Sequence, residues 1–293
     1  MAKLAIKNSG GVPFLILKGN FVVRTRQMPD GDTIAFAASS TYKRGPVETN
    51  VPVSTDGLKT VNIRLQSIDA TEKSQPFGAA SRDALLKRLG FDPAALGLSD
   101  TDFSASGDPP VQVPGWLATH GIDGNQRPLG YIFRKNPGGF SHSKIVSASD
   151  MLDVIKSSEN YLQAIGGWAF PAFYNNTDES HAMVFAAAAV KARTANKGVW
   201  AQDETISGFV PTKDALHVGG TLVYPKFYRR VQKWTANKPD AKAFINWLKK
   251  QKDGKKLVHG AKKDPIQLWE LFEIVSARKV AVPYDVTKLW FSE

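Results

Sequence analysis

The sequence predicts an α+β fold, in which a five-stranded β-barrel with three helices precedes a mainly helical C-terminal extension. Two observations support this. Five stretches rich in β-branched and aromatic residues are separated by turn signals, and three segments carry apolar residues at helical spacing. After residue 203 the pattern becomes mainly helical. The order β-β-β-α-β-β-α-α is that of an OB-like barrel. We therefore expect a barrel domain at 1–203 and an extension at 204–293.

The strands are recognised by alternation and by the turns between them. Val61–Ile68 is the clearest, because every second residue points to the same face. Asp30-Gly31 is a turn signal ahead of the second strand. Polar stretches with Gly and Pro, at about 39–57 and 91–110, are expected to be insertions on the surface. The five strands are expected at 13–25, 33–37, 61–68, 111–120 and 129–133.

The helices are recognised by their start and stop signals. Pro76 suits the first turn of the first helix, and Gly90 ends it. Thr177 can cap the third helix, which Lys197-Gly198 ends. Helices are expected at 74–89, 151–165 and 177–196 in the barrel domain, and at 227–233, 239–250 and 265–275 in the extension.

Composition points to a basic protein without thiol chemistry. The sequence has no cysteine, which excludes disulfides, zinc thiolate sites and cysteine nucleophiles. With 38 Lys and Arg against 27 Asp and Glu, its net charge is +11. The extension holds 17 basic and 9 acidic residues (+8), whereas residues 1–203 hold 21 and 18 (+3). This balance favours a polyanionic partner, of which nucleic acid is the commonest.

Nothing in the sequence indicates a membrane protein. Met1–Gly10 lacks the apolar segment of a secretory signal, and the longest apolar run, Met183–Val190, is too short to cross a bilayer. We expect a cytoplasmic location by default, or a secreted protein if the sequence was trimmed. No protein partner is evident from the sequence.

Charged residues are expected together at one end of the barrel. Arg64, Asp69 and Glu72 leave the third strand, and Asp32 opens the second. The carboxylates of Asp32 and Asp69, with waters and a carbonyl, would make an open calcium site. Glu72 would reach a neighbouring water and accept its proton. The guanidiniums of Arg64 and Arg127 would flank a phosphate, whose oxygens they match.

Simpler interpretations of these residues stay open. The triplet at 64, 69 and 72 would also suit surface ion pairs, which are common and weak. Asp30-Gly31-Asp32 would suit a plain hairpin turn. Glu72 would suit the first turn of a helix. Asp32 and Asp69 are expected to be surface carboxylates that the core does not need.

Several motifs in order carry a family resemblance that covers about 13–203. They are Asp-Gly-Asp-Thr (30–33), Arg-Leu-x-x-Ile-Asp-x-x-Glu (64–72), Asp-x-x-x-Arg followed by Leu-x-Tyr-Ile (123–132), and Asn-Asn-Thr (175–177) before an alanine-rich helix and Lys-Gly-Val-Trp (197–200). This series resembles the staphylococcal nuclease, or thermonuclease-like, family.

The resemblance implies a calcium-dependent nuclease that hydrolyses phosphodiester bonds of DNA, RNA or both and leaves 3′-phosphate ends. Glu72 would be the general base, and Arg64 and Arg127 would stabilise the phosphorane-like transition state. The implied calcium ligands are Asp32, Asp69 and the backbone carbonyl of Ala70.

The sequence departs from the family pattern at two places, and two residues compete for a third position. Ala70-Thr71 stand where the family usually has a proline between the acids. Asn125 stands where a phosphate-contacting tyrosine is expected. A second such tyrosine is Tyr174, with Phe173 as its rival for the position.

Two other functions are compatible with the same sequence. One is a catalytically inactive nucleic-acid- or protein-binding module on this fold, although all five polar site residues are present. The other is an interaction scaffold whose extension is the working part. For the nuclease, we expect the extension to add phosphate contacts outside the catalytic cleft.

Overall fold

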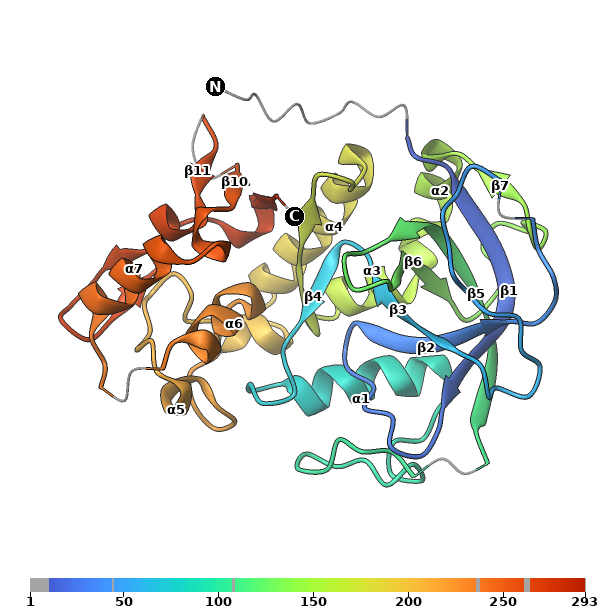
Figure 1. Cartoon of the computed structure of the whole chain (residues 1–293), viewed down its shortest axis with the longest axis horizontal. Coiled ribbons are helices and arrows are strands. Elements are labelled where there is room, and N and C mark those ends of the chain that lie inside the picture. The colour runs from blue at the N-terminus through green and yellow to red at the C-terminus, as the bar shows by residue number, and fades with distance from the viewer. Residues whose placement is uncertain (1–10, 44, 107–108, 236–237, 261–263, 293) are drawn as a thin grey trace.

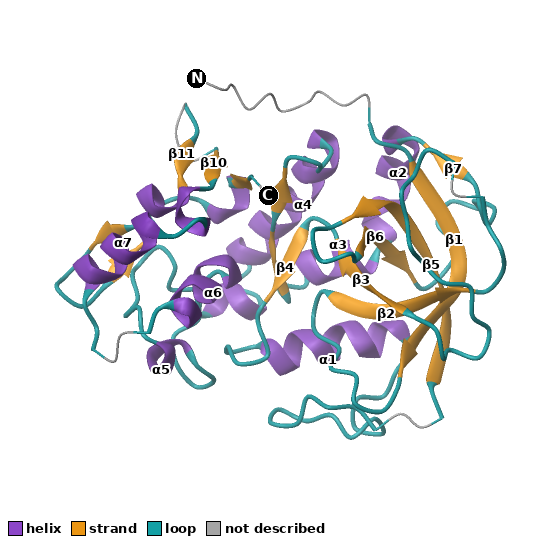
Figure 2. Cartoon of the chain, in the orientation of Figure 1, coloured by secondary structure: helices purple, strands orange, loops and turns teal. Residues whose placement is uncertain are grey.

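The computed structural model describes residues 11–43, 45–106, 109–235, 238–260 and 264–292. Segment 1–10, on which the expectation of no secretory signal depends, lies outside these residues. The protein is a mixed α+β molecule, with the barrel strands gathered on one side and the extension on the other (Figures 1 and 2). Helix α4 lies between the two parts (Figure 1).

The predicted five-stranded barrel is confirmed. The strands neighbour one another in the order β2-β3-β6-β5-β1, and β1 pairs back with β2 to close the ring. All pairs are antiparallel except β3 with β6. The closed ring is consistent with an OB-like barrel. The barrel strands are β1 (Phe14–Val23), β2 (Thr33–Ala38), β3 (Val61–Leu65), β5 (Val111–Ile122) and β6 (Pro128–Phe133).

Strand β1 is one continuous strand, and two glycines allow the chain to pack closely around it. Gly19 lies directly opposite Gly115 in the β1–β5 register. A Cβ at Gly19 would collide with the carbonyl oxygen of Ala37, and one at Gly115 would collide with the ring of Phe21. Because neither position has room for a side chain, glycine permits the close approach that a small barrel needs.

The described residues before 203 contain four α-helices, where the sequence predicted three. The predicted helix at 151–165 is two helices, because Ser158 adopts an extended conformation and its side chain caps the second one by accepting from Tyr161 N. The first helix ends at Gly90 as predicted, but it starts at Gly78 rather than Ser74. The helices are α1 (Gly78–Leu89), α2 (Ala148–Val154), α3 (Glu159–Ile165) and α4 (Glu179–Thr194).

The extension is less helical than predicted. The helices expected at 227–233 and 239–250 are present, but the prediction of a helix at 265–275 is wrong. There Gln267 and Glu270 form a capping box that supports a single 3-10 turn, and Ile274 continues into a hairpin. The extension contains α5 (Lys213–Leu216), α6 (Pro225–Lys233), α7 (Ala241–Lys250), β10 (Leu257–His259), β11 (Ile266–Gln267), β12 (Glu273–Ile274), β13 (Val280–Ala281) and β14 (Trp290–Phe291).

The extension packs onto the end of the barrel domain. Strand β14 pairs in parallel with β9 (Phe173–Tyr174). A second apolar core joins α4 to α6 and α7, with Phe227, Phe244 and Phe291 buried in it. Strand β4 (Ile68–Ala70) leaves the barrel, pairs with β8 (Ala169–Pro171), and contacts α6. This packing places α6 over the strand ends where the charged residues were expected. The remaining strand, β7 (Ile145–Val146), pairs with β1.

Candidate active site

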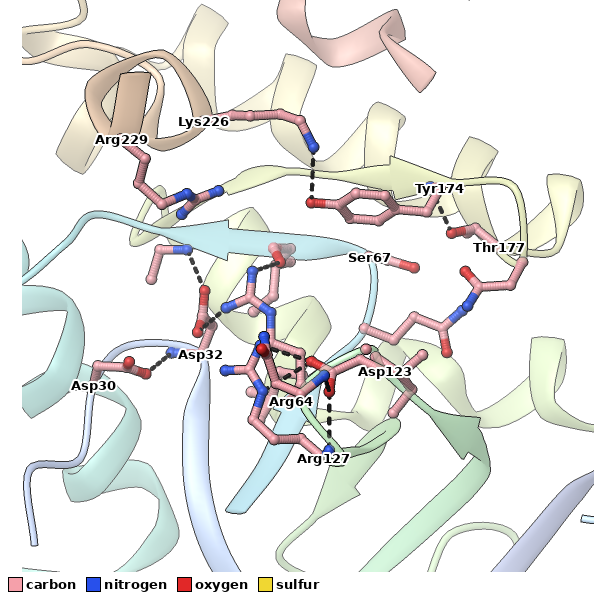
Figure 3. Close-up of a pocket in the computed structure, with 18 of the residues that line it drawn as sticks. Asp30, Asp32, Arg64, Ser67, Asp123, Arg127, Tyr174, Thr177, Lys226 and Arg229 are labelled. Carbon is pink, nitrogen blue, oxygen red and sulfur yellow. Dashed lines mark hydrogen bonds and ion pairs between the residues drawn. The ribbon is translucent and has the colours of Figure 1, made fainter. Parts of the chain in front are cut away.

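A cleft of about 550 Å³ opens between the strand ends of the barrel and helix α6. Six of the seven residues predicted for the site line it. The seventh, Asp69, lies directly behind it and is bonded to two residues of its wall. Figure 3 shows Asp32, Arg64 and Arg127 of the barrel on one side of the cleft and Lys226 and Arg229 of α6 on the other. The six lining residues are Asp32, Arg64, Ala70, Glu72, Arg127 and Tyr174.

Arg64 links the two carboxylates predicted to bind calcium, Asp32 and Asp69. One of its terminal nitrogens, Nη1, pairs with Asp32 Oδ1, and the other, Nη2, lies 2.7 Å from Asp69 Oδ1. The register of β2 with β3 sets up this contact, since Thr33 lies opposite Arg64. Between β3 and β4, Ser67 takes a left-handed conformation (φ 67°) that turns the chain back toward Arg64.

The burial of the two carboxylates differs from the expectation. Asp32 is 3% exposed and Asp69 is 0% exposed, so neither is a surface group. Asp32 Oδ2 also accepts a hydrogen bond from the backbone N–H of Ala70 at 2.7 Å. Buried charges must be paired, and here the guanidiniums meet that need. Burial alone would raise the pKa of Asp69, but Arg229 and Arg64 hold it below the usual range.

Arg229 of α6 is a site residue that the sequence analysis missed. Its Nη2 lies 2.7 Å from Asp69 Oδ2, and its Nη1 lies 2.7 Å from Glu72 Oε1 and 3.1 Å from Asp69 Oδ1. The guanidinium therefore joins a predicted metal ligand to the predicted general base. A signal for it exists in the sequence, because Lys226, Arg229 and Arg230 have helical spacing and so form one basic face.

Glu72 and Arg127 both line the cleft and remain accessible. The side chain of Glu72 is 37% exposed. Arg127 is held by Asp123, whose Oδ2 lies 2.7 Å from its Nη2 and 2.8 Å from its Nε. This fork fixes the guanidinium in the cleft wall beside Asn125, which also lines the cleft.

Of the two rival aromatic residues, Tyr174 lines the cleft and Phe173 is buried in the core. The Tyr174 hydroxyl accepts a hydrogen bond from Lys226 Nζ at 3.3 Å (Figure 3). Lys226, Arg229, Arg230 and Lys256 of the extension all line the same cleft. The expectation that the basic groups of the extension lie outside it is therefore wrong for these four.

The donors near Asp32 and Asp69 are oxygens, which is the kind that calcium takes. A calcium ion that binds here must take these oxygens from the groups that now hold them. Both Asp69 oxygens and one Asp32 oxygen are paired with guanidiniums, and the other Asp32 oxygen is bonded to Ala70 N. Over the described residues, no group of three or more His, Asp or Glu side chains is placed to hold a metal ion.

Replacing Asp69 with alanine is expected to destabilise the protein, contrary to what an exposed carboxylate would imply. Arg64 and Arg229 would each lose a charged partner in a mostly buried setting, and breaking such a network costs about 3 kcal/mol. Urea unfolding of Asp69→Ala measures the loss, with Asp100→Ala, at an exposed position, as the control. An unchanged unfolding midpoint for Asp69→Ala would show that water replaces the lost carboxylate at no cost.

Comparison with known proteins gives no assignment, since no family model matches the chain and no curated protein matches it. In the part of the chain that the structure describes, no helix is both long and apolar enough to cross a membrane.

Proposed function

We propose that this protein is a nuclease that hydrolyses phosphodiester bonds of nucleic acid in the cleft below α6. The observation that carries the proposal is a single cleft lined by three guanidiniums, those of Arg64, Arg127 and Arg229, and by one carboxylate, Glu72, that is open to solvent. Guanidiniums match phosphate oxygens in charge and geometry, and a carboxylate beside them can take a proton from water. The family resemblance of the sequence supports the same reaction.

In this reaction Glu72 accepts a proton from a water molecule whose oxygen forms a bond to phosphorus. The bond from phosphorus to the leaving ester oxygen breaks, and that oxygen is then protonated. Arg64 and Arg127 stabilise the negative charge that develops on the other phosphate oxygens. The hydrogen bond from Arg229 engages Glu72 Oε1, and the carboxylate has a second oxygen with which to accept the proton.

A second candidate function has an observation in its favour. Arg229 and Arg64 neutralise Asp69, and Arg229 also binds Glu72. A cleft whose acids are occupied in this way would bind a phosphate chain without cleaving it. The alternative is therefore a nucleic-acid-binding module. It predicts binding without turnover, in contrast to the nuclease.

The calcium requirement is a separate part of the proposal, because it follows from the resemblance and not from the geometry. We expect the protein to cleave end-labelled single-stranded DNA or RNA in the presence of Ca²⁺ and to stop when a chelator is in excess. Gel separation of the products measures this, and restored cleavage after Ca²⁺ is returned is the control. Undiminished cleavage in chelator would remove calcium from the proposal and leave the nuclease in place.

A further inference from the structure

The wall that α6 contributes to the cleft contains two buried cations on consecutive turns. Lys226 is 6% exposed and Arg230 is 7% exposed, and both line the cleft. Lys256, which is half-buried, lines it beside them. Cations are rarely buried this far unless they are paired with acids or bound to a ligand.

Among the described residues, these cations have too few anionic partners. Lys226 Nζ is bonded to the Tyr174 hydroxyl and lies 4.5 Å and 4.2 Å from the ring centroids of Tyr174 and Phe291. Across the described residues, no carboxylate lies within 4.0 Å of this amine. Aromatic faces attract a cation but do not neutralise it.

Arg230 also has too few acidic partners among the described residues. Its nearest acid is Asp253, with Oδ2 3.6 Å from Nη2, and that oxygen is already bonded to Lys233 Nζ at 2.7 Å. Its Nη1 donates to the backbone carbonyl of Lys226 at 3.3 Å. Its Nε is buried and, among the described atoms, has no hydrogen-bond partner.

Among the residues that the structure describes, nearby acids do not supply the missing negative charge. Asp69, the barrel acid that acts on both cations, is shared between Arg64 and Arg229. Burial, together with the positive charge of Arg230, lowers the pKa of Lys226 to about 7. Burial also lowers the pKa of Arg230. An anion in this part of the cleft would offset both costs.

We propose that Lys226, Arg230 and Lys256 form a second phosphate-binding subsite, which takes a phosphate group of the polynucleotide other than the one that is cleaved. Its assignment to a nucleic-acid phosphate rests on the proposed function. The subsite lies on the extension, with Lys226 and Arg230 on α6, whereas Arg64 and Arg127 come from the barrel, so a bound strand would run from the barrel end of the cleft to the extension.

The test compares a dinucleotide that has only its internal phosphate with the same dinucleotide carrying one added terminal phosphate, at the 5′ or the 3′ end. Calorimetry in chelator measures binding of each probe to the full chain without turnover. For the unmodified protein we expect the added phosphate, at one of the two ends, to tighten binding about tenfold or more, as charge-assisted hydrogen bonds do.

Lys226→Met and Arg230→Met should lose this gain, and Lys242→Met, which removes an exposed lysine of α7, should keep it. Lys226→Met should also melt at the same temperature or higher, because it removes a buried charge without an acidic partner. A purely structural lysine would give a lower melting temperature. If Arg230→Met fails to fold, the binding gain measured for Lys226→Met alone decides whether the subsite exists.

The subsite is refuted if neither terminal phosphate improves binding, or if the improvement survives in both α6 variants. Its failure is separate from that of the nuclease, since these measurements involve no hydrolysis. A protein that shows the gain but never cleaves nucleic acid would retain the subsite and lose the proposed reaction.

Discussion

The Glu72→Gln variant is expected to hydrolyse nucleic acid about 10²- to 10⁴-fold more slowly than the unmodified protein, which is the usual cost of losing a general base. Glutamine has almost the same shape and keeps a carbonyl oxygen that can accept the hydrogen bond from Arg229, but it cannot take a proton from water. Substrate affinity should therefore change little. Single-turnover cleavage of an end-labelled oligonucleotide separates the rate of the reaction from binding.

The matched control for this variant is Glu48→Gln, which makes the same change at an exposed position in the 39–57 insertion. It should cleave at the unmodified rate. Equal rates for all three proteins would mean that a different group activates the water.

The Arg64→Lys variant is expected to slow cleavage about 10²- to 10³-fold, the cost of losing one preorganised donor to the developing charge. Lysine keeps the positive charge but is a single point charge, so it cannot bind Asp32, Asp69 and a phosphate oxygen with the geometry of the fork. Because both carboxylates are buried, the variant should also be less stable. Single-turnover rates and urea unfolding measure the two effects.

Arg127→Lys separates the catalytic effect from the structural one. Arg127 is bonded to Asp123, whose side chain is 12% exposed, and its own side chain is 31% exposed. We expect Arg127→Lys to lose activity with a much smaller loss of stability than Arg64→Lys. If Arg64→Lys kept full activity while Arg127→Lys lost it, Arg64 would be a structural link between the carboxylates and not a phosphate ligand.

Much of the barrel could be predicted from sequence because its strands are local patterns. Alternation from Val61 onward and the turn signal at Asp30-Gly31 each depend on neighbouring residues, and the closed barrel follows from the order of the strands. The strand predicted at 61–68 ends at Leu65, because Ser67 takes a left-handed conformation that breaks it before Ile68. The break at Ser158 was missed because the apolar spacing on either side of it continues in phase. The prediction of a helix at 265–275 was wrong because it was made from the local sequence alone. In the folded chain Ile274 pairs with Val280 across a hairpin.

The site was predictable only where its residues lie close in sequence. Asp69 and Glu72 follow Arg64 closely in the sequence, so their proximity could be inferred. Arg229 lies 157 residues after Glu72, and only the folded chain shows that they touch. The burial of Asp69 depends on the same packing of α6, which explains why it was expected to be exposed.

The most direct test of the central claim follows cleavage and binding of one labelled oligonucleotide, in Ca²⁺ and with protein in excess, for the unmodified chain beside Glu72→Gln. The nuclease proposal predicts that both proteins bind the oligonucleotide with similar affinity and that only the unmodified chain converts it to shorter products. Tight binding by both, with no products from either on DNA or RNA, would contradict the nuclease and favour the binding module.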